Sequence, residues 1–205
     1  MKKEVKKNDN IGIDFDLLAI KNNTNSNDIY AIITNYEKLE DSQNSIIKND
    51  IKPNGKLESL LKNDNYDSAL AYLDSLIKKD KNNILHKKNY CNVWAAKLFK
   101  FNAPITKDII NCYVNLKQDD DYEINYTLGM LYFKTNVISP SVKNKFVISY
   151  LTKVVNYFSS KNVSILTHNE KEIYYNSLYI RGITKLKEGD KTGQKDLDLC
   201  KNRVN

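Results

Sequence analysis

The stretch NYDSALAYLDSLIKKDKNN (residues 65–83) decides which fold this chain can adopt. Its apolar residues recur at spacings of three and four, which places them on one face of an α-helix. Asp67 stands in the first turn, where a negative charge suits the helix dipole. We therefore expect an amphipathic helix whose Ala69, Leu73 and Leu76 face other helices.

The composition of the whole chain also favours helices. Of its 205 residues, 41% are hydrophobic and 28% are charged, which is enough for a core but not a generous one. Six Gly and three Pro are too few for a sandwich or barrel, which needs a turn about every 8–12 residues. No run of 18 apolar residues occurs, so the sequence predicts no transmembrane segment.

Further helices are expected on both sides of the opening stretch. Apolar residues at helical spacing precede it over 27–42 and near 57–61 and follow it over 84–101, 106–116, 122–134, 141–158, 167–187 and 190–204. Loops are expected at 135–141, which contains Pro140, and at 159–166. Thr167 and Glu170 have the spacing of a capping box, and Asp190 is expected to cap the final helix. The pattern predicts eight or nine helices and no strand.

The chain divides into two parts on composition. Residues 1–25 are charged and polar and are expected to form a flexible N-terminal segment. Residues 26–205 are expected to form a single helical domain.

Three later segments repeat a common pattern. They are Lys87-x2-Tyr90-Cys91-x2-Trp94, Asn125-x2-Leu128-Gly129-x2-Tyr132 and Leu178-x2-Arg181-Gly182-x2-Lys185. Each places a small residue between large ones on one helix. A small residue lets paired helices touch, and its large neighbours fill the groove around the contact.

Together with the opening stretch, these segments resemble degenerate tetratricopeptide repeats, whose unit is about 34 residues. The resemblance covers roughly residues 50–200, with matches at 56–83, 84–117, 122–158 and 168–202. It implies an all-α fold, an α-solenoid of stacked antiparallel helix pairs without a β-sheet. The chain departs from the family where Lys81 replaces the usual Pro and Gln194 the expected Ala. Another α-solenoid class therefore stays open.

The spacing of the small residues is irregular. Cys91 and Gly129 are 38 residues apart, and Gly129 and Gly182 are 53 apart. Both spacings exceed the repeat length of about 34 residues, which leaves open whether residues 135–166 form an insertion or a full repeat. The resemblance implies a partner-binding concave face built by the first helix of each repeat. Candidate partner-binding residues there are Asn89, Asn92, Lys97, Asn125, Lys134, Asn176, Tyr179 and Lys185.

The three cysteines, Cys91, Cys112 and Cys200, are far apart in the sequence. None forms a CxxC pair, and an odd number cannot all pair within the chain. We therefore expect neither a disulfide framework nor a zinc site, with Cys91 and Cys112 as small buried thiols.

Nothing in the sequence indicates catalysis. His86 and His168 stand at expected helix starts, where exposed side chains are the rule. The run Asp119-Asp120-Asp121 lacks the Gly and distal Glu of a calcium loop and is expected to be a solvated turn. No catalytic motif or phosphate-binding loop occurs. We expect no enzyme activity, cofactor or metal.

Three functions stay in view. The leading hypothesis is a non-enzymatic scaffold that binds a peptide or a partner protein. The second is a dedicated inhibitor, of the kind that gives immunity to a toxin, because the array is short and irregular. The third is nucleic-acid binding, suggested by the net charge of +7. The small number of arginines argues against it: the chain has only two, Arg181 and Arg203, and arginine is the residue that most often contacts bases and phosphates.

The compartment also has two readings. Unpaired cysteines fit a reduced cytoplasm. Alternatively, the charged segment Lys2–Asn10 resembles the tether of a bacterial lipoprotein, with Met1 in the place of a lipidated Cys.

Overall fold

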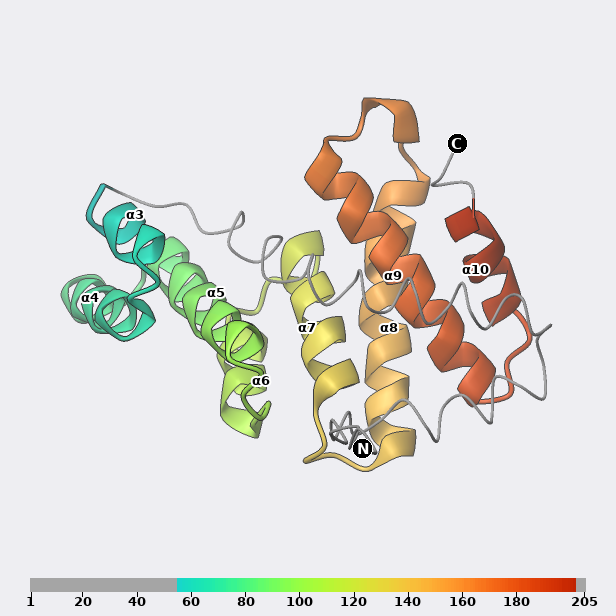
Figure 1. The fold of residues 1–205 in the computed structure, drawn as a ribbon, viewed down its shortest axis with the longest axis horizontal. Helices are drawn as coiled ribbons and strands as arrows, with labels where there is room; N and C mark the ends of the chain where they lie inside the picture. Colours follow the sequence, from blue (N-terminus) through green and yellow to red (C-terminus); the bar gives the residue numbers. More distant parts are fainter. Residues whose placement is uncertain (1–54, 202–205) are drawn as a thin grey trace, which may run out of the picture.

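The computed structural model describes residues 55–201 and shows an all-helical protein (Figure 1). Over these residues the chain forms eight α-helices and one short 3-10 helix, and it forms no strand. The elements are α3 (Gly55–Lys62), α4 (Tyr66–Lys79), α5 (Ile84–Lys100), α6 (Lys107–Val114), α7 (Tyr122–Lys134), α8 (Pro140–Ser159), η1 (Val163–Ile165), α9 (His168–Lys187) and α10 (Gly193–Lys201). The expected N-terminal segment at 1–25 and the expected helix at 27–42 lie outside the described residues.

Each helix packs mainly against its neighbours in the chain. Contacts run in order from α3 and α4 to α9 and α10, and α7 also contacts α9. Figure 1 shows α3–α5 at one end of the described part and α8–α10 at the other, with α7 between them. Among the described helices, the packing between α5 and α7 runs chiefly through the short α6.

The opening stretch forms the helix that its periodicity predicts. The side chain of Asn65 caps α4 by accepting a hydrogen bond from the backbone N–H of Ser68 at 3.2 Å. Ala69 and Leu73 are buried, with 0% and 1% of their surface exposed, and Leu76 is half-buried against the core. The predicted inner face of this helix is therefore confirmed.

Two glycines mark the closest helix contacts. A Cβ atom added at Gly129 would lie 2.4 Å from Cδ2 of Leu151 on α8. One added at Gly182 would lie 2.9 Å from the backbone oxygen of Gly193, at the start of α10. Both distances are too short for a side chain to fit without movement. The predicted reason for small residues, that paired helices touch there, is confirmed at these two positions.

Several helix ends agree with the sequence. The capping box of α9 is present, with Thr167 accepting from the backbone of Glu170 at 3.2 Å and Glu170 accepting from the backbone of Thr167 at 2.9 Å. Residues 141–158, whose pattern is apolar and β-branched, are helical within α8. Gly189 follows α9 with a φ of +81°, a backbone conformation that glycine adopts without strain.

Other helix ends differ from the predictions. Pro140 is the first residue of α8 and not part of a loop, because a helix needs no N–H donor from its first turn. The helix expected to carry Leu116 ends at Val114. The last helix begins at Gly193, and Asp190 lies in the turn before it, where it accepts a hydrogen bond from the backbone of Thr192 at 2.9 Å. The loop expected at 159–166 contains η1.

Within residues 55–201, every helix is too short or too polar to cross a lipid bilayer.

Replacing Ala69 with Trp is expected to lower the free energy of unfolding by about 1–3 kcal/mol, because the indole cannot fit into a fully packed contact. Ala71 is exposed on the same helix, so Ala71→Trp is the matched control and should have little effect. Thermal or urea denaturation measures both. Equal stability of the two variants would show that α4 is packed in a different register.

Candidate functional site

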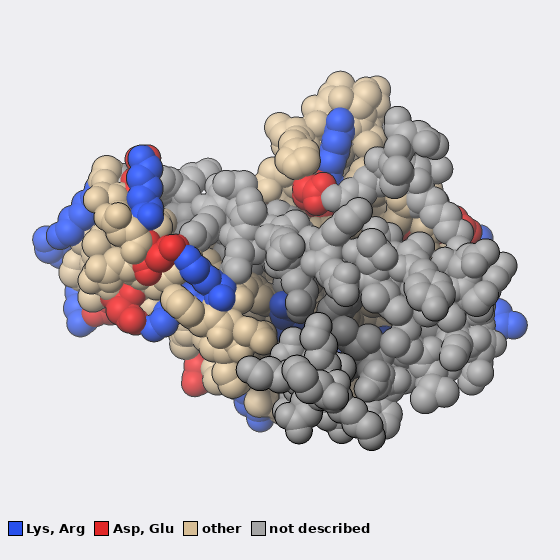
Figure 2. All heavy atoms as spheres, viewed as in Figure 1, with Lys and Arg blue, Asp and Glu red and all other residues tan. Residues whose placement is uncertain are grey.

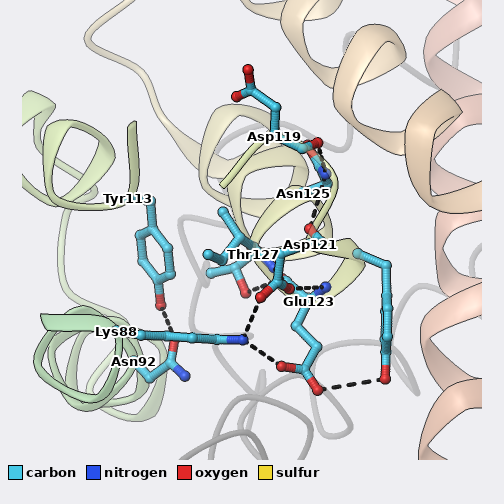
Figure 3. Close-up of polar contacts among 10 residues, drawn as sticks. Lys88, Asn92, Tyr113, Asp119, Asp121, Glu123, Asn125 and Thr127 are labelled. Atoms are coloured by element: carbon cyan, nitrogen blue, oxygen red, sulfur yellow. Dashed lines mark hydrogen bonds and ion pairs between the residues drawn. The ribbon is translucent and has the colours of Figure 1, made fainter. Parts of the chain in front are cut away.

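A group of connected polar contacts lies where α5, α6 and α7 meet (Figure 3). Lys88 of α5 extends its ammonium group between two carboxylates of α7 and its N-cap. Its Nζ lies 2.7 Å from Oδ2 of Asp121 and 2.6 Å from Oε2 of Glu123. The three side chains are only 13%, 24% and 23% exposed. Their partial burial makes this a stronger contact than an open surface ion pair.

Asp121 has two structural roles in this group. Its Oδ1 accepts hydrogen bonds from the backbone N–H groups of Glu123 at 2.9 Å and Ile124 at 3.1 Å, which caps α7. Its Oδ2 holds Lys88. One carboxylate therefore both begins α7 and fixes its end against α5.

The pKa of Lys88 reflects two opposing effects. Burial lowers it, while the hydrogen bonds and charges of Asp121 and Glu123 raise it, and the net result is a pKa above the ordinary value of 10.5. Lys88 is therefore charged at neutral pH.

Two asparagines predicted to bind a partner belong to the same junction. Oδ1 of Asn92 accepts a hydrogen bond from the hydroxyl of Tyr113 on α6 at 2.8 Å. The Nδ2 group of Asn125 donates to the backbone oxygens of Asp119 at 2.7 Å and Asp121 at 2.9 Å. Both amides tie helices and turns together (Figure 3).

A disulfide between Cys91 on α5 and Cys112 on α6 corrects the prediction of buried thiols. The two Cα atoms are 5.8 Å apart although 21 residues separate them in the chain. Spacing could not reveal the pair, because it depends on how closely α5 and α6 pack. Cys200 is half-buried and forms no disulfide, and its Sγ lies 3.5 Å from the backbone oxygen of Tyr175.

A second buried ion pair joins α9 to α10. Nε and Nη2 of Arg181 lie 2.8 Å and 2.6 Å from the two carboxylate oxygens of Asp196. Only 8% of Arg181 and 5% of Asp196 is exposed. Lys185 adds a third contact at 3.2 Å to Oδ2 of Asp196. This fork-shaped pairing fixes the angle of α10 on α9.

The eight candidate partner-binding residues lie on α5, α7 and α9. Five of them are buried side chains of the helix interfaces, with 1–5% of their surface exposed: Asn89, Asn92, Asn125, Asn176 and Tyr179. The three lysines are partly exposed and have intramolecular contacts. Lys97 pairs with Asp67, Lys185 with Asp196, and Nζ of Lys134 lies 5.0 Å from the centre of the Phe99 ring. The structure does not gather the eight into one open site.

The remaining titratable candidates of the sequence lie on α5, on α9 and in the turn before α7. His168 is exposed as expected, whereas His86 is half-buried, and its Nδ1 has no hydrogen-bond partner. Asp119 and Asp120 are exposed in a turn, and Asp121 caps a helix. Over residues 55–201 no group of three or more His, Cys, Asp or Glu side chains could hold a metal ion.

Comparison of the chain with models of protein families, with curated proteins and with solved structures gave no match.

Sequence reasoning missed the contacts that hold this junction. Lys88 is 33 residues from Asp121, and a pair so distant leaves no periodic signal. The N-cap role of Asp121 could have been read from its place just before the helix that begins at Tyr122. The disulfide had no readable signal.

The disulfide predicts a specific thiol count. In denaturant without a reducing agent, one of the three cysteines, Cys200, should react with an alkylating reagent, and all three should react after reduction. Mass spectrometry of the intact and digested protein measures this. The variant Cys112→Ala should instead show two reactive thiols without reduction. Three reactive thiols in the unreduced protein would contradict the pairing. Loss of the bond is expected to cost about 3 kcal/mol of stability.

Replacing Lys88 with Met should lower the free energy of unfolding at pH 7 by about 2 kcal/mol, because Asp121 and Glu123 lose their cation. A raised folded-state pKa contributes stability that is complete below 10.5 and is lost as the pH rises through the folded value. The difference in the free energy of unfolding between the variant and the parent should therefore decrease above that pH. Urea denaturation from pH 7 to 11 measures it, with the exposed Lys79→Met as control. A difference in unfolding free energy that stays constant with pH would contradict a charge-based role of Lys88.

Proposed function

We propose that this chain is a non-enzymatic protein-interaction module, a tetratricopeptide-like array that holds a peptide or a partner protein. The observation that carries the proposal is the packing of each helix against its chain neighbours, with glycine contacts at Gly129 and Gly182. Helices that stack in chain order leave their outer faces side by side as an extended surface. Such a surface suits recognition of another chain.

The contacts of the polar residues support the same proposal. The conspicuous ionic groups, Lys88 with its two carboxylates and Arg181 with Asp196, join one helix to the next. Of the candidate partner-binding residues, only Lys97, Lys134 and Lys185 present side-chain surface that a partner could reach. We propose these three as the part of the predicted set that contacts a partner.

The disulfide bears on where the module works. Disulfides persist in oxidising compartments and are rare in the cytosol. The Cys91–Cys112 bond therefore supports a function outside the cytosol.

Affinity capture tests the proposed function. The full-length chain would be immobilised and exposed to native lysate and secreted fractions, with Ala69→Trp as a packing-defective control and mass spectrometry as the readout. We expect one partner that the parent captures reproducibly, that the control loses, and that binds the purified parent in solution. Failure to find such a partner across varied growth conditions would contradict the proposal.

A further inference from the structure

The outward side of α8 is unusual for an exposed helix surface. One side of the helix is buried through Val147, Leu151, Val154, Val155 and Phe158. The flank of the helix beside α7 exposes 43% of Val142, 40% of Phe146 and 36% of Tyr157, while the side opposite the buried residues carries Lys145, Ser149 and Asn156. The apolar surface of α8 thus extends from its buried side onto an exposed flank.

The outward residues form one continuous row. Val142, Phe146, Tyr150, Lys153 and Tyr157 follow one another at offsets of 4, 4, 3 and 4, and we call this row the α8 stripe. At a rise of 1.5 Å per residue it is roughly 22 Å long. That length matches about four turns of a partner helix.

The rings of the stripe are held in place by α7. Phe146 stacks on Tyr132 with ring centres 4.6 Å apart, and Tyr157 stacks on Tyr122 at the same distance. Because these rings are already ordered, a partner would lose less side-chain entropy on binding them. Aromatic groups of this kind often provide most of the binding energy of an interface.

The charge around the stripe has one dominant sign. Between Glu123 and Glu170 the chain has no acidic residue but has five lysines, at positions 134, 143, 145, 153 and 161. Lys145 and Lys153 are exposed on α8. Three carboxylates from other elements act on this segment: Asp119 acts electrostatically on Tyr150, Glu170 interacts with Lys161, and Glu188 accepts a hydrogen bond from Asn144 at 2.7 Å. The five lysines outnumber these three.

The α3–α5 end of the described part is different. Figure 2 shows basic and acidic side chains interspersed there. Its lysines pair locally, Lys62 with Glu58, Lys78 with Asp74 and Lys100 with Asp64. Charges that neutralise one another attract no particular partner. Residues 55–100 also have more lysines than acidic residues, nine against five, but carboxylates are interspersed among them, whereas residues 124–169 have lysines and no acidic residue.

We propose that the α8 stripe is the docking surface for an acidic amphipathic helix of a second protein. Apolar residues of that helix would pack between Val142, Phe146 and Tyr157 as ridges fit into grooves, and its carboxylates would meet Lys145 and Lys153. The inference rests on the proposed interaction function, and it names the surface and the class of partner.

The observations favour a protein helix over a nucleic acid. The segment from 124 to 169 contains no arginine. The Tyr157 ring is stacked on Tyr122, and Nζ of Lys161 lies 3.9 Å from its centre. Because 36% of Tyr157 stays exposed, an apolar side chain can still contact it, whereas a base needs an open ring face to stack on.

Fluorescence anisotropy with defined probes tests the inference. The probes are a labelled 15-residue helical peptide with leucines at spacings of three and four flanked by glutamates, the same peptide with lysines for glutamates, and a single-stranded oligonucleotide. The proteins are the full chain and its variants Lys145→Glu/Lys153→Glu and Phe146→Ser. The matched control is Lys195→Glu/Leu199→Ser, which alters an exposed lysine and an exposed leucine on α10.

We expect the parent to bind the acidic peptide, with affinity falling as salt rises. Each α8 variant should bind at least about tenfold more weakly, and the α10 control should bind like the parent. Circular dichroism melts identify variants that fail to fold. The charge variant leaves the stacked Phe146 in place and so separates docking from packing.

Four results would overturn the inference: no binding of the acidic peptide, equal binding of the lysine peptide, equal weakening by the α10 control, or tighter binding of the oligonucleotide through the same lysines. A natural partner found by affinity capture distinguishes failure of this inference from failure of the proposed function. If affinity capture yields a partner that both α8 variants still bind, the interaction function stands and only the α8 assignment fails.

Discussion

The close contact between helices at Gly129 and Gly182 is the constraint on which the C-terminal half of the structure depends. At Gly129 the backbone of α7 lies against Leu151 of α8, and at Gly182 the backbone of α9 meets that of Gly193. Because glycine adds no Cβ at either contact, the paired helices lie near enough for their large neighbours to interlock. The Arg181–Asp196 pair then fixes α10 on α9. Helix α8 is enclosed between α7 and α9, which leaves a single side of it to face outward.

The junction between α5 and α7 is held differently, because α6 has only eight residues and offers little apolar surface. A disulfide, ion pairs and hydrogen bonds hold these helices together instead. The Cys91–Cys112 disulfide fastens α6 to α5, and Lys88 reaches across to the capped end of α7. The hydroxyl of Thr135, just after α7, donates to the backbone oxygen of Ile105 at 3.0 Å. These contacts fix the angle at which the two halves meet, which loosely packed apolar groups would leave variable.

Polar residues that a repeat pattern places on a binding face are used here to assemble the helices. Asn92 and Asn125 join helices and turns, and both are almost fully buried. A surface available for recognition must therefore be sought among residues that remain exposed. On α8 these include the apolar Val142, Phe146 and Tyr157 and the basic Lys145 and Lys153. The sequence contains one indication of this surface, because no acidic residue occurs between Glu123 and Glu170. That indication can be interpreted only when the structure shows that Phe146 and Tyr157 of α8 are exposed.

The sequence by itself determined the helices and most of their limits, because periodicity, caps and breakers act over a few residues. The inner face of α4 at Ala69 and Leu73, the capping box at Thr167 and the small residues at Gly129 and Gly182 were all readable in this way. Helix ends at Pro140 and Gly193 were misplaced, since local signals there fit more than one boundary. The tertiary structure alone decided the Cys91–Cys112 bond, the Lys88 contacts and the burial of the predicted binding residues. The bond and the Lys88 contacts join positions more than 20 residues apart, and burial depends on which helix packs against a given face. A local sequence pattern contains neither kind of information.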